Sequence, residues 1–177
     1  MAIATPITPL IAHEVPCAAV APTTIMSAFS RLLVELAALV EAERDLEHFD
    51  IWDIALDNWL REAELAHTRV TTLIFGIRNA APVLPADRKL QRVATLIDMM
   101  IGSEEPGTFR RLHCNLHRVD GLFRHAGADP ITRRVAALLA GARSHIDALA
   151  TLSAFVDPLM ADALHEASTA VGTPEAA

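Results

Sequence analysis

The stretch that decides the fold is residues 25–48, which read IMSAFSRLLVELAALVEAERDLEH. Large apolar side chains recur in it at alternating steps of four and three residues: Ile25, Phe29, Leu32, Leu36 and Leu39. This spacing is the apolar stripe of an amphipathic α-helix. Thr23 or Thr24 can cap the first turn, so we expect a helix from there to about His48.

A second amphipathic stretch follows almost at once. Asp50 is a suitable N-cap, and the apolar residues after it keep a heptad-like register up to about Arg78: Trp52, Leu56, Trp59, Ala63, Ala66, Val70, Leu73 and Ile77. Because only Phe49 and Asp50 separate the two stretches, we expect a long antiparallel helical hairpin.

The rest of the chain shows three more helical patterns and a short final one. Gly, Pro and Asp-Pro signals set their limits, and the expected ranges are about 86–101, 106–125, 130–152 and 158–170. Residues 1–22 read as a flexible Ala/Pro/Thr tail, and residues 171–177 should fray. The sequence therefore predicts an all-α protein whose single domain, residues 23–170, is a five-helix bundle with a short C-terminal helix.

Charge and composition exclude some classes of function. The net charge is −7, so a general nucleic-acid binder is disfavoured. The charge is uneven: −6 over residues 1–79, +3 over 80–150 and −4 over 151–177. The two cysteines suggest no disulfide framework, and neither a signal peptide nor a membrane span is recognisable. We expect a cytoplasmic protein that binds neither membrane nor nucleic acid.

No short catalytic or nucleotide-binding motif occurs, so an enzyme is less favoured than a binding protein. Three acid-x-x-His pairs do occur: Asp45/His48, Glu64/His67 and Asp162/His165. This spacing sets both side chains on one face of a helix, where they can share a metal ion. The first pair lies on the polar face of its helix, which indicates a solvated charge run.

One hypothesis is a metal site inside the bundle. Several acids and histidines on four different helices lie inward or beside an inward position, and they are its candidate ligands: Glu43, Glu64, His67, His113 and His145. Carboxylate and imidazole ligands of this kind suit iron, manganese or zinc. The competing interpretation is structural: Glu43 pairs with an arginine, and each histidine is neutral and hydrogen-bonded to a neighbour. This second interpretation is favoured, and with it no cofactor is predicted.

The favoured function is protein–protein interaction, plausibly with a second copy of the chain. Trp52 and Trp59 lie seven residues apart on one helix face, where they either anchor a partner or fill the core. Arg110 and Arg118 belong to a basic face that is suited to an acidic face around residues 41–64. A small-molecule-binding bundle is a third class, for which an apolar cavity beside the tryptophans would be the sign.

Overall fold

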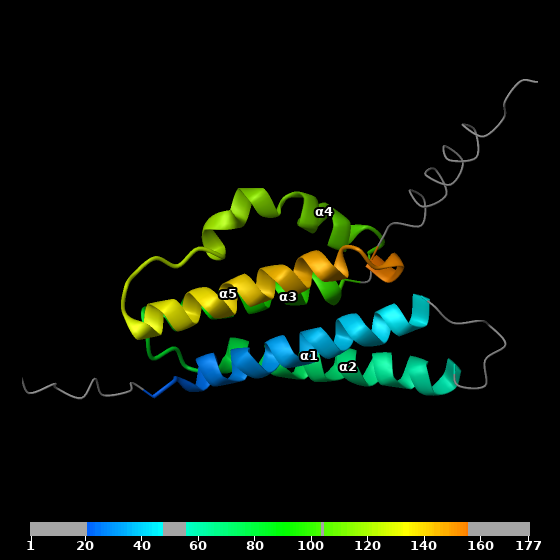
Figure 1. Cartoon of the computed structure of the whole chain (residues 1–177), viewed down its shortest axis with the longest axis horizontal. Helices are drawn as coiled ribbons and strands as arrows, with labels where there is room; N and C mark the ends of the chain where they lie inside the picture. The colour runs from blue at the N-terminus through cyan, green and yellow to red at the C-terminus, as the bar shows by residue number, and fades with distance from the viewer. Residues whose placement is uncertain (1–20, 48–55, 104, 156–177) are drawn as a thin grey trace, which may run out of the picture.

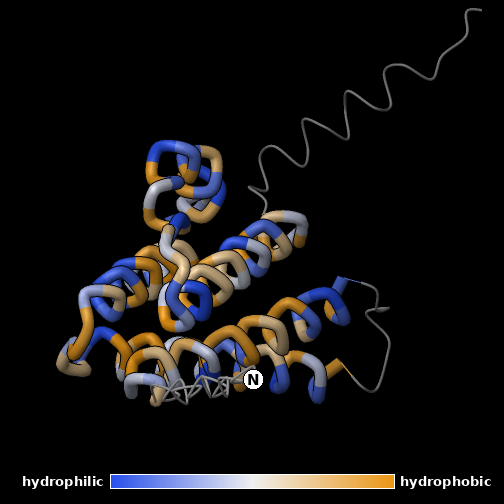
Figure 2. Tube along the Cα trace, turned by 60° about the vertical axis from the view of Figure 1, so that its left-hand side comes forward, coloured by the Kyte–Doolittle hydropathy of each residue, from blue (hydrophilic) through white to orange (hydrophobic). Residues whose placement is uncertain are grey.

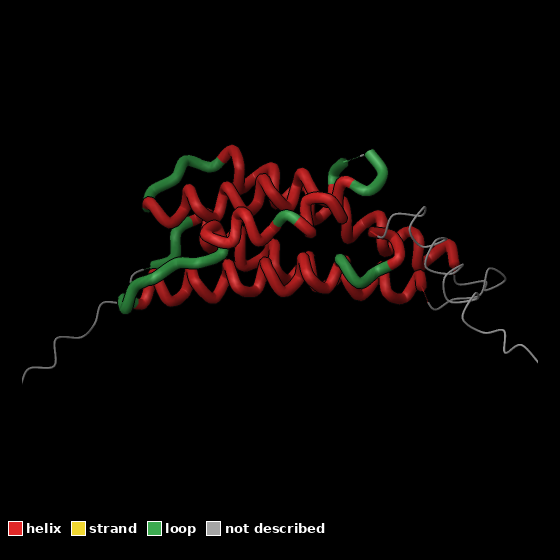
Figure 3. Tube along the Cα trace, turned by 90° about the horizontal axis from the view of Figure 1, so that it is seen from above, coloured by secondary structure: helices red, strands yellow, loops and turns green. Residues whose placement is uncertain are grey.

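The computed structural model describes residues 21–47, 56–103 and 105–155, and within these ranges it contains helices, turns and loops but no strand (Figure 3). This confirms the all-α class. The helices are α1 (Thr24–Glu47), α2 (Leu56–Asn79), α3 (Pro85–Ile101), α4 (Thr108–Cys114) and α5 (Pro130–Leu149), with 3₁₀ segments η1 (Leu116–Leu122) and η2 (Ser153–Phe155) (Figure 1). Residues 1–20, the expected start of the second helix, and the expected helix at 158–170 with the end after it lie outside the described residues.

Four long helices form the bundle. Helix α1 packs against α2 and α5, and α3 packs against α2 and α5, so the order around the bundle is α1, α2, α3, α5. Helix α2 is antiparallel to α1, α3 and α5, as Figure 1 shows. Contacts at both ends of α1 fit its parallel orientation to α3 and α5. Thr23, just before α1, contacts Asp87 in the first turn of α3. At the other end of α1, the Glu47 carboxylate accepts from the backbone N–H of Ser153, which follows α5.

The apolar stripes expected from the sequence make the core. On α1 the side chains of Phe29, Leu32 and Leu36 are fully buried, and on α3 the stripe from Leu90 to Met100 is buried. Hydrophobic and hydrophilic residues alternate along each long helix in Figure 2, as they do on amphipathic helices. Burial of these stripes is what holds the four helices together.

Helices α1 and α5 come close because Gly141 has no side chain. A Cβ atom placed on Gly141 would lie 3.0 Å from Cδ1 of Leu33. The absence of this methyl group lets the α5 backbone pack directly on the α1 side chains.

The predicted helix over 106–125 is wrong in part, because α4 ends at Cys114 and a 3₁₀ segment follows. The side-chain amide of Asn115 donates to the carbonyl of Arg111, 2.7 Å away. In an uninterrupted α-helix, the Arg111 carbonyl would accept from the backbone N–H of Asn115. Here that N–H donates to the carbonyl of Leu112 instead. The chain then crosses back over α3 with Val119 outside helical geometry.

One charged residue among the described ones is fully buried, and it organises the start of α3. The carboxylate of Asp87 accepts from the backbone N–H groups of Val83 and Leu84, each at 2.9 Å, and from the Thr23 hydroxyl at 2.7 Å. Thr23 in turn accepts from the backbone N–H of Met26 and caps α1, as expected. The ends of α1 and α3 are thereby tied together.

None of the helices that the structure describes has the length and apolar character that crossing a membrane requires.

Candidate functional site

Two of the predicted metal ligands lie close together near the C-terminal end of α1. Glu43 on α1 interacts electrostatically with His67 on α2. The His67 ring nitrogen Nε2 lies 3.4 Å from the carbonyl oxygen of Ile101, at the end of α3. Three helices therefore supply polar groups to one partly buried region, where a carboxylate and an imidazole interact electrostatically.

Burial is the main influence on Glu43. It raises the pKa of this carboxyl group above the usual value, the nearby His67 lowers it, and Glu47 raises it further. The net direction is upward, so the charged form is disfavoured where Glu43 sits.

Replacing Glu43 by glutamine should therefore stabilise the protein at neutral pH. An acid whose pKa is raised on folding costs stability as the pH rises through the folded-state value, and that cost is absent at acid pH. Glutamine never carries the charge, so E43Q should have the higher free energy of unfolding at about pH 7 and a smaller advantage near pH 4. Urea unfolding at both pH values measures this difference. The matched control is E64Q at an exposed position of α2, which should change little; a destabilised E43Q at neutral pH would contradict this expectation.

His113 is held in a second cluster on the other side of the bundle. Its Nε2 lies 2.8 Å from Oδ1 of Asp147 on α5, and Nε of Arg143 donates to the same carboxylate at 3.0 Å. Asp147 was not among the predicted site residues. The sequence signal for Asp147 is its position four residues after Arg143, a spacing that favours an ion pair on one face of a helix. The His113 partner, 34 residues away, has no local signal.

The other two predicted ligands differ in burial. Glu64 is exposed on α2, and His145 is half-buried on α5, where burial lowers the pKa of its imidazole. Within the described ranges no three histidine, cysteine or acidic side chains are close enough together to hold a metal ion. Metal binding by iron, manganese or zinc stays a prediction, which elemental analysis of the purified full chain and of its H67A variant would test.

The predicted interaction residues differ in their surroundings. Trp59 is half-buried in the first turn of α2, and Trp52 lies outside the described residues. Arg111 on α4 pairs with Glu105 at 2.9 Å, and Arg124, just after η1, pairs with Asp120 at 2.5 Å. Arg110 is partly exposed and Arg118 is exposed, and neither forms an ion pair with another described residue. Those two arginines are the cations of this face that remain open to a partner.

An acidic groove lies on the outer side of the α1–α2 hairpin. It has a volume of about 330 Å³ and is lined by alanines, by Leu65, and by charged residues of both helices: Glu41, Asp45, Glu62 and Arg69. The lining thus contains three carboxylates and one guanidinium, that of Arg69. The guanidinium forms an ion pair with Glu35, at 4.0 Å between nitrogen and oxygen. Leu65 in this lining is 46% exposed, so the groove combines negative charge with an uncovered apolar side chain.

The exposed apolar side chains of α2 were not predicted. Phe75 is 70% exposed, and Leu60 and Leu65 are nearly half exposed. All three lie off the core stripe of the helix, and that is the signal by which they could have been found.

No protein-family model matches the chain, and neither the curated proteins nor the solved structures contain a significant match to it.

Proposed function

We propose that this chain is a non-enzymatic helical protein that acts by binding protein, and that a second copy of the chain is one such partner. The observation that carries the proposal is the groove on the α1–α2 hairpin, whose lining combines the carboxylates of Glu41, Asp45 and Glu62 with the uncovered Leu65. Protein-binding surfaces usually combine apolar side chains with polar and charged ones.

Charge complementarity supports a second copy of the chain as the partner. The groove is acidic, whereas Arg110 and Arg118 on the α4–η1 side carry positive charge that other described residues do not neutralise. These two faces belong to different sides of one molecule, so the acidic groove of one copy can meet the arginines of the next. Such a contact is head-to-tail, and it weakens as salt screens the charges.

Charge reversal tests this contact. We expect the double variant E41K/E62K to associate with itself about tenfold more weakly than the wild type, because its groove would repel the arginines. R110E/R118E should lose self-association for the converse reason. Light scattering coupled to size-exclusion chromatography measures both.

A mixture of the two double variants tests whether the two faces bind each other. The reversed groove of one should attract the reversed face of the other, so the mixture should associate more strongly than either variant alone. The matched control is E64K, a like change at an exposed position of α2 outside the groove lining, which should keep self-association. Self-association that is unchanged in both double variants would overturn the assignment of these faces.

A further inference from the structure

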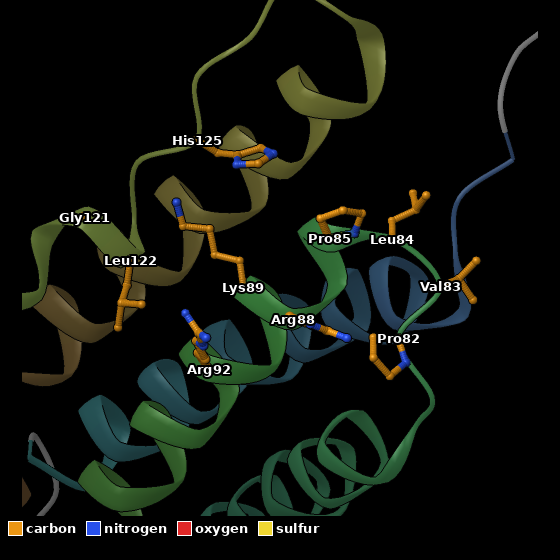
Figure 4. A pocket seen from close by; sticks show the side chains of 10 residues that line it. All are labelled: Pro82, Val83, Leu84, Pro85, Arg88, Lys89, Arg92, Gly121, Leu122 and His125. Carbon is orange, nitrogen blue, oxygen red and sulfur yellow. The ribbon is translucent and has the colours of Figure 1, made fainter.

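A pocket of about 680 Å³ lies where the start of α3 meets the end of η1 and the loop after it (Figure 4). One wall is the Pro82–Pro85 turn with the first two turns of α3, and the other wall is Gly121, Leu122 and His125. The two walls are about 35 residues apart in sequence, so the tertiary fold creates the pocket. Its volume is in the range of small-molecule sites, roughly 300–1,000 Å³.

The charge in this pocket is of one sign. Its lining contains Arg88, Lys89, Arg92 and His125, and it contains no carboxylate. Arg88 and Arg92 are one helical turn apart on α3 and form no ion pair with any described residue. In Figure 4, Lys89 extends toward the wall that carries His125, and Arg88 extends toward Pro82.

The two acids that are adjacent in sequence to lining residues have partners outside the pocket lining or in the backbone. Asp87 is fully buried, with its oxygens bonded to Thr23 and to the backbone of Val83 and Leu84. Asp120 pairs with Arg124. The backbone donors just before α3 are also used by Asp87, so the positive character of the pocket comes from its side chains and not from a helix end.

Apolar groups complete the lining. Pro82, Val83, Leu84 and Pro85 form one edge, and Leu122 lies opposite. Val83 is 76% exposed, so this apolar edge is open to a ligand. The prolines fix the backbone of the edge, and Lys89 is held because its ammonium group donates to the carbonyl of Arg124. The pocket is therefore largely formed before any ligand arrives.

We propose that this pocket binds a small organic anion, with a phosphate or carboxylate group held by Lys89, Arg92 and His125, Arg88 on the Pro82 side of the pocket, and an apolar body against Pro82, Val83 and Leu122. Arginine and lysine side chains bind such groups through charge-assisted hydrogen bonds, and the apolar edge accepts a flat ring or a short hydrocarbon. A long nucleic acid is a poorer fit, because the overall charge of −7 repels an extended polyanion. The site shares no residue with the groove of the α1–α2 hairpin, so it does not depend on the proposed self-association.

Calorimetric titration of the full chain with 1-naphthyl phosphate tests the proposal. We expect saturable one-to-one binding in the micromolar to low-millimolar range. The double variant R88Q/R92Q should bind about tenfold or more weakly, because it loses both guanidinium groups. The matched control R133Q/R134Q removes two exposed arginines of α5 and should leave the affinity within about twofold of the wild type. Circular dichroism establishes that both variants are folded.

Three further probes define the ligand. The carboxylate 1-naphthoate separates a general anion site from one that requires phosphate, and either of these results supports the proposal if R88Q/R92Q weakens the binding. Uncharged 1-naphthol should bind far more weakly than the phosphate. No saturable binding of either anion, equal affinity for 1-naphthol, or unchanged affinity in R88Q/R92Q would overturn the proposal. Binding of heparin alone would also overturn it, since that result would indicate an extended polyanion as partner.

Discussion

Replacing Phe29 by alanine should lower the free energy of unfolding by about 3–5 kcal/mol, the largest effect that we expect from any single substitution. Phe29 is fully buried on α1, among side chains contributed by the other helices of the bundle. Truncation removes the transfer free energy of the ring and leaves a cavity that a close-packed core fills only in part. Domains have only about 5–15 kcal/mol of stability in total, so much of it would be lost.

The matched control is F75A. Phe75 is the same residue type on α2, but it is 70% exposed, and its truncation should change the free energy of unfolding by less than about 0.5 kcal/mol. Urea unfolding followed by circular dichroism gives both values. Similar losses in the two variants would mean that Phe29 is not in the core. A larger loss for F75A would indicate that Phe75 is covered, either by part of the chain or by a second copy.

Replacing Asp87 by alanine should cost about 2–4 kcal/mol. The backbone N–H groups of Val83 and Leu84 would lose their shared acceptor, and the Thr23 hydroxyl would lose its partner. Buried donors without partners cost far more than exposed ones, because water does not replace the lost hydrogen bonds. The start of α3 and the cap of α1 should loosen together, and hydrogen exchange at residues 83–90 should become faster than in the wild type.

Asp129 supplies the comparison for this prediction. It also caps a helix, with Oδ1 accepting from the backbone N–H of Thr132 at 2.9 Å, but it is exposed. D129A should therefore cost about 1 kcal/mol, the ordinary value of an N-cap. If D87A lowers the free energy of unfolding no more than D129A does, the buried network at the start of α3 stabilises the protein no more than an ordinary exposed N-cap.

The long helices were predictable because their signals are local. The three- and four-residue spacing from Ile25 to Leu39, the Asp129-Pro130 start of α5 and the stripe of α3 all act within a few residues along the chain. Each was confirmed. The α4–η1 crossover was mispredicted because the Asn115 side chain competes for a backbone carbonyl, and a hydrophobic pattern does not record this competition.

The candidate sites were predictable only in part, because they depend on contacts between distant segments. Glu43 and His67 were singled out by their inward positions, and they do lie close together. His113 was also singled out, but the position of its partner Asp147 depends on the packing of α5. Likewise, Arg88 and Arg92 look like ordinary surface residues until the fold sets His125 and Leu122 opposite them. A sequence pattern predicts which face of a helix is apolar, but it does not predict which other segment packs against that face.

If the acidic hairpin groove of one copy binds the arginine face of another, the protein should associate with itself at low salt. Light scattering on the wild-type protein over a wide concentration series, at low and at high salt, measures this association. We expect a molar mass that rises with concentration above that of the 19.1 kDa monomer at low salt and returns toward it at high salt. A strict monomer at the highest concentration in low salt would contradict it.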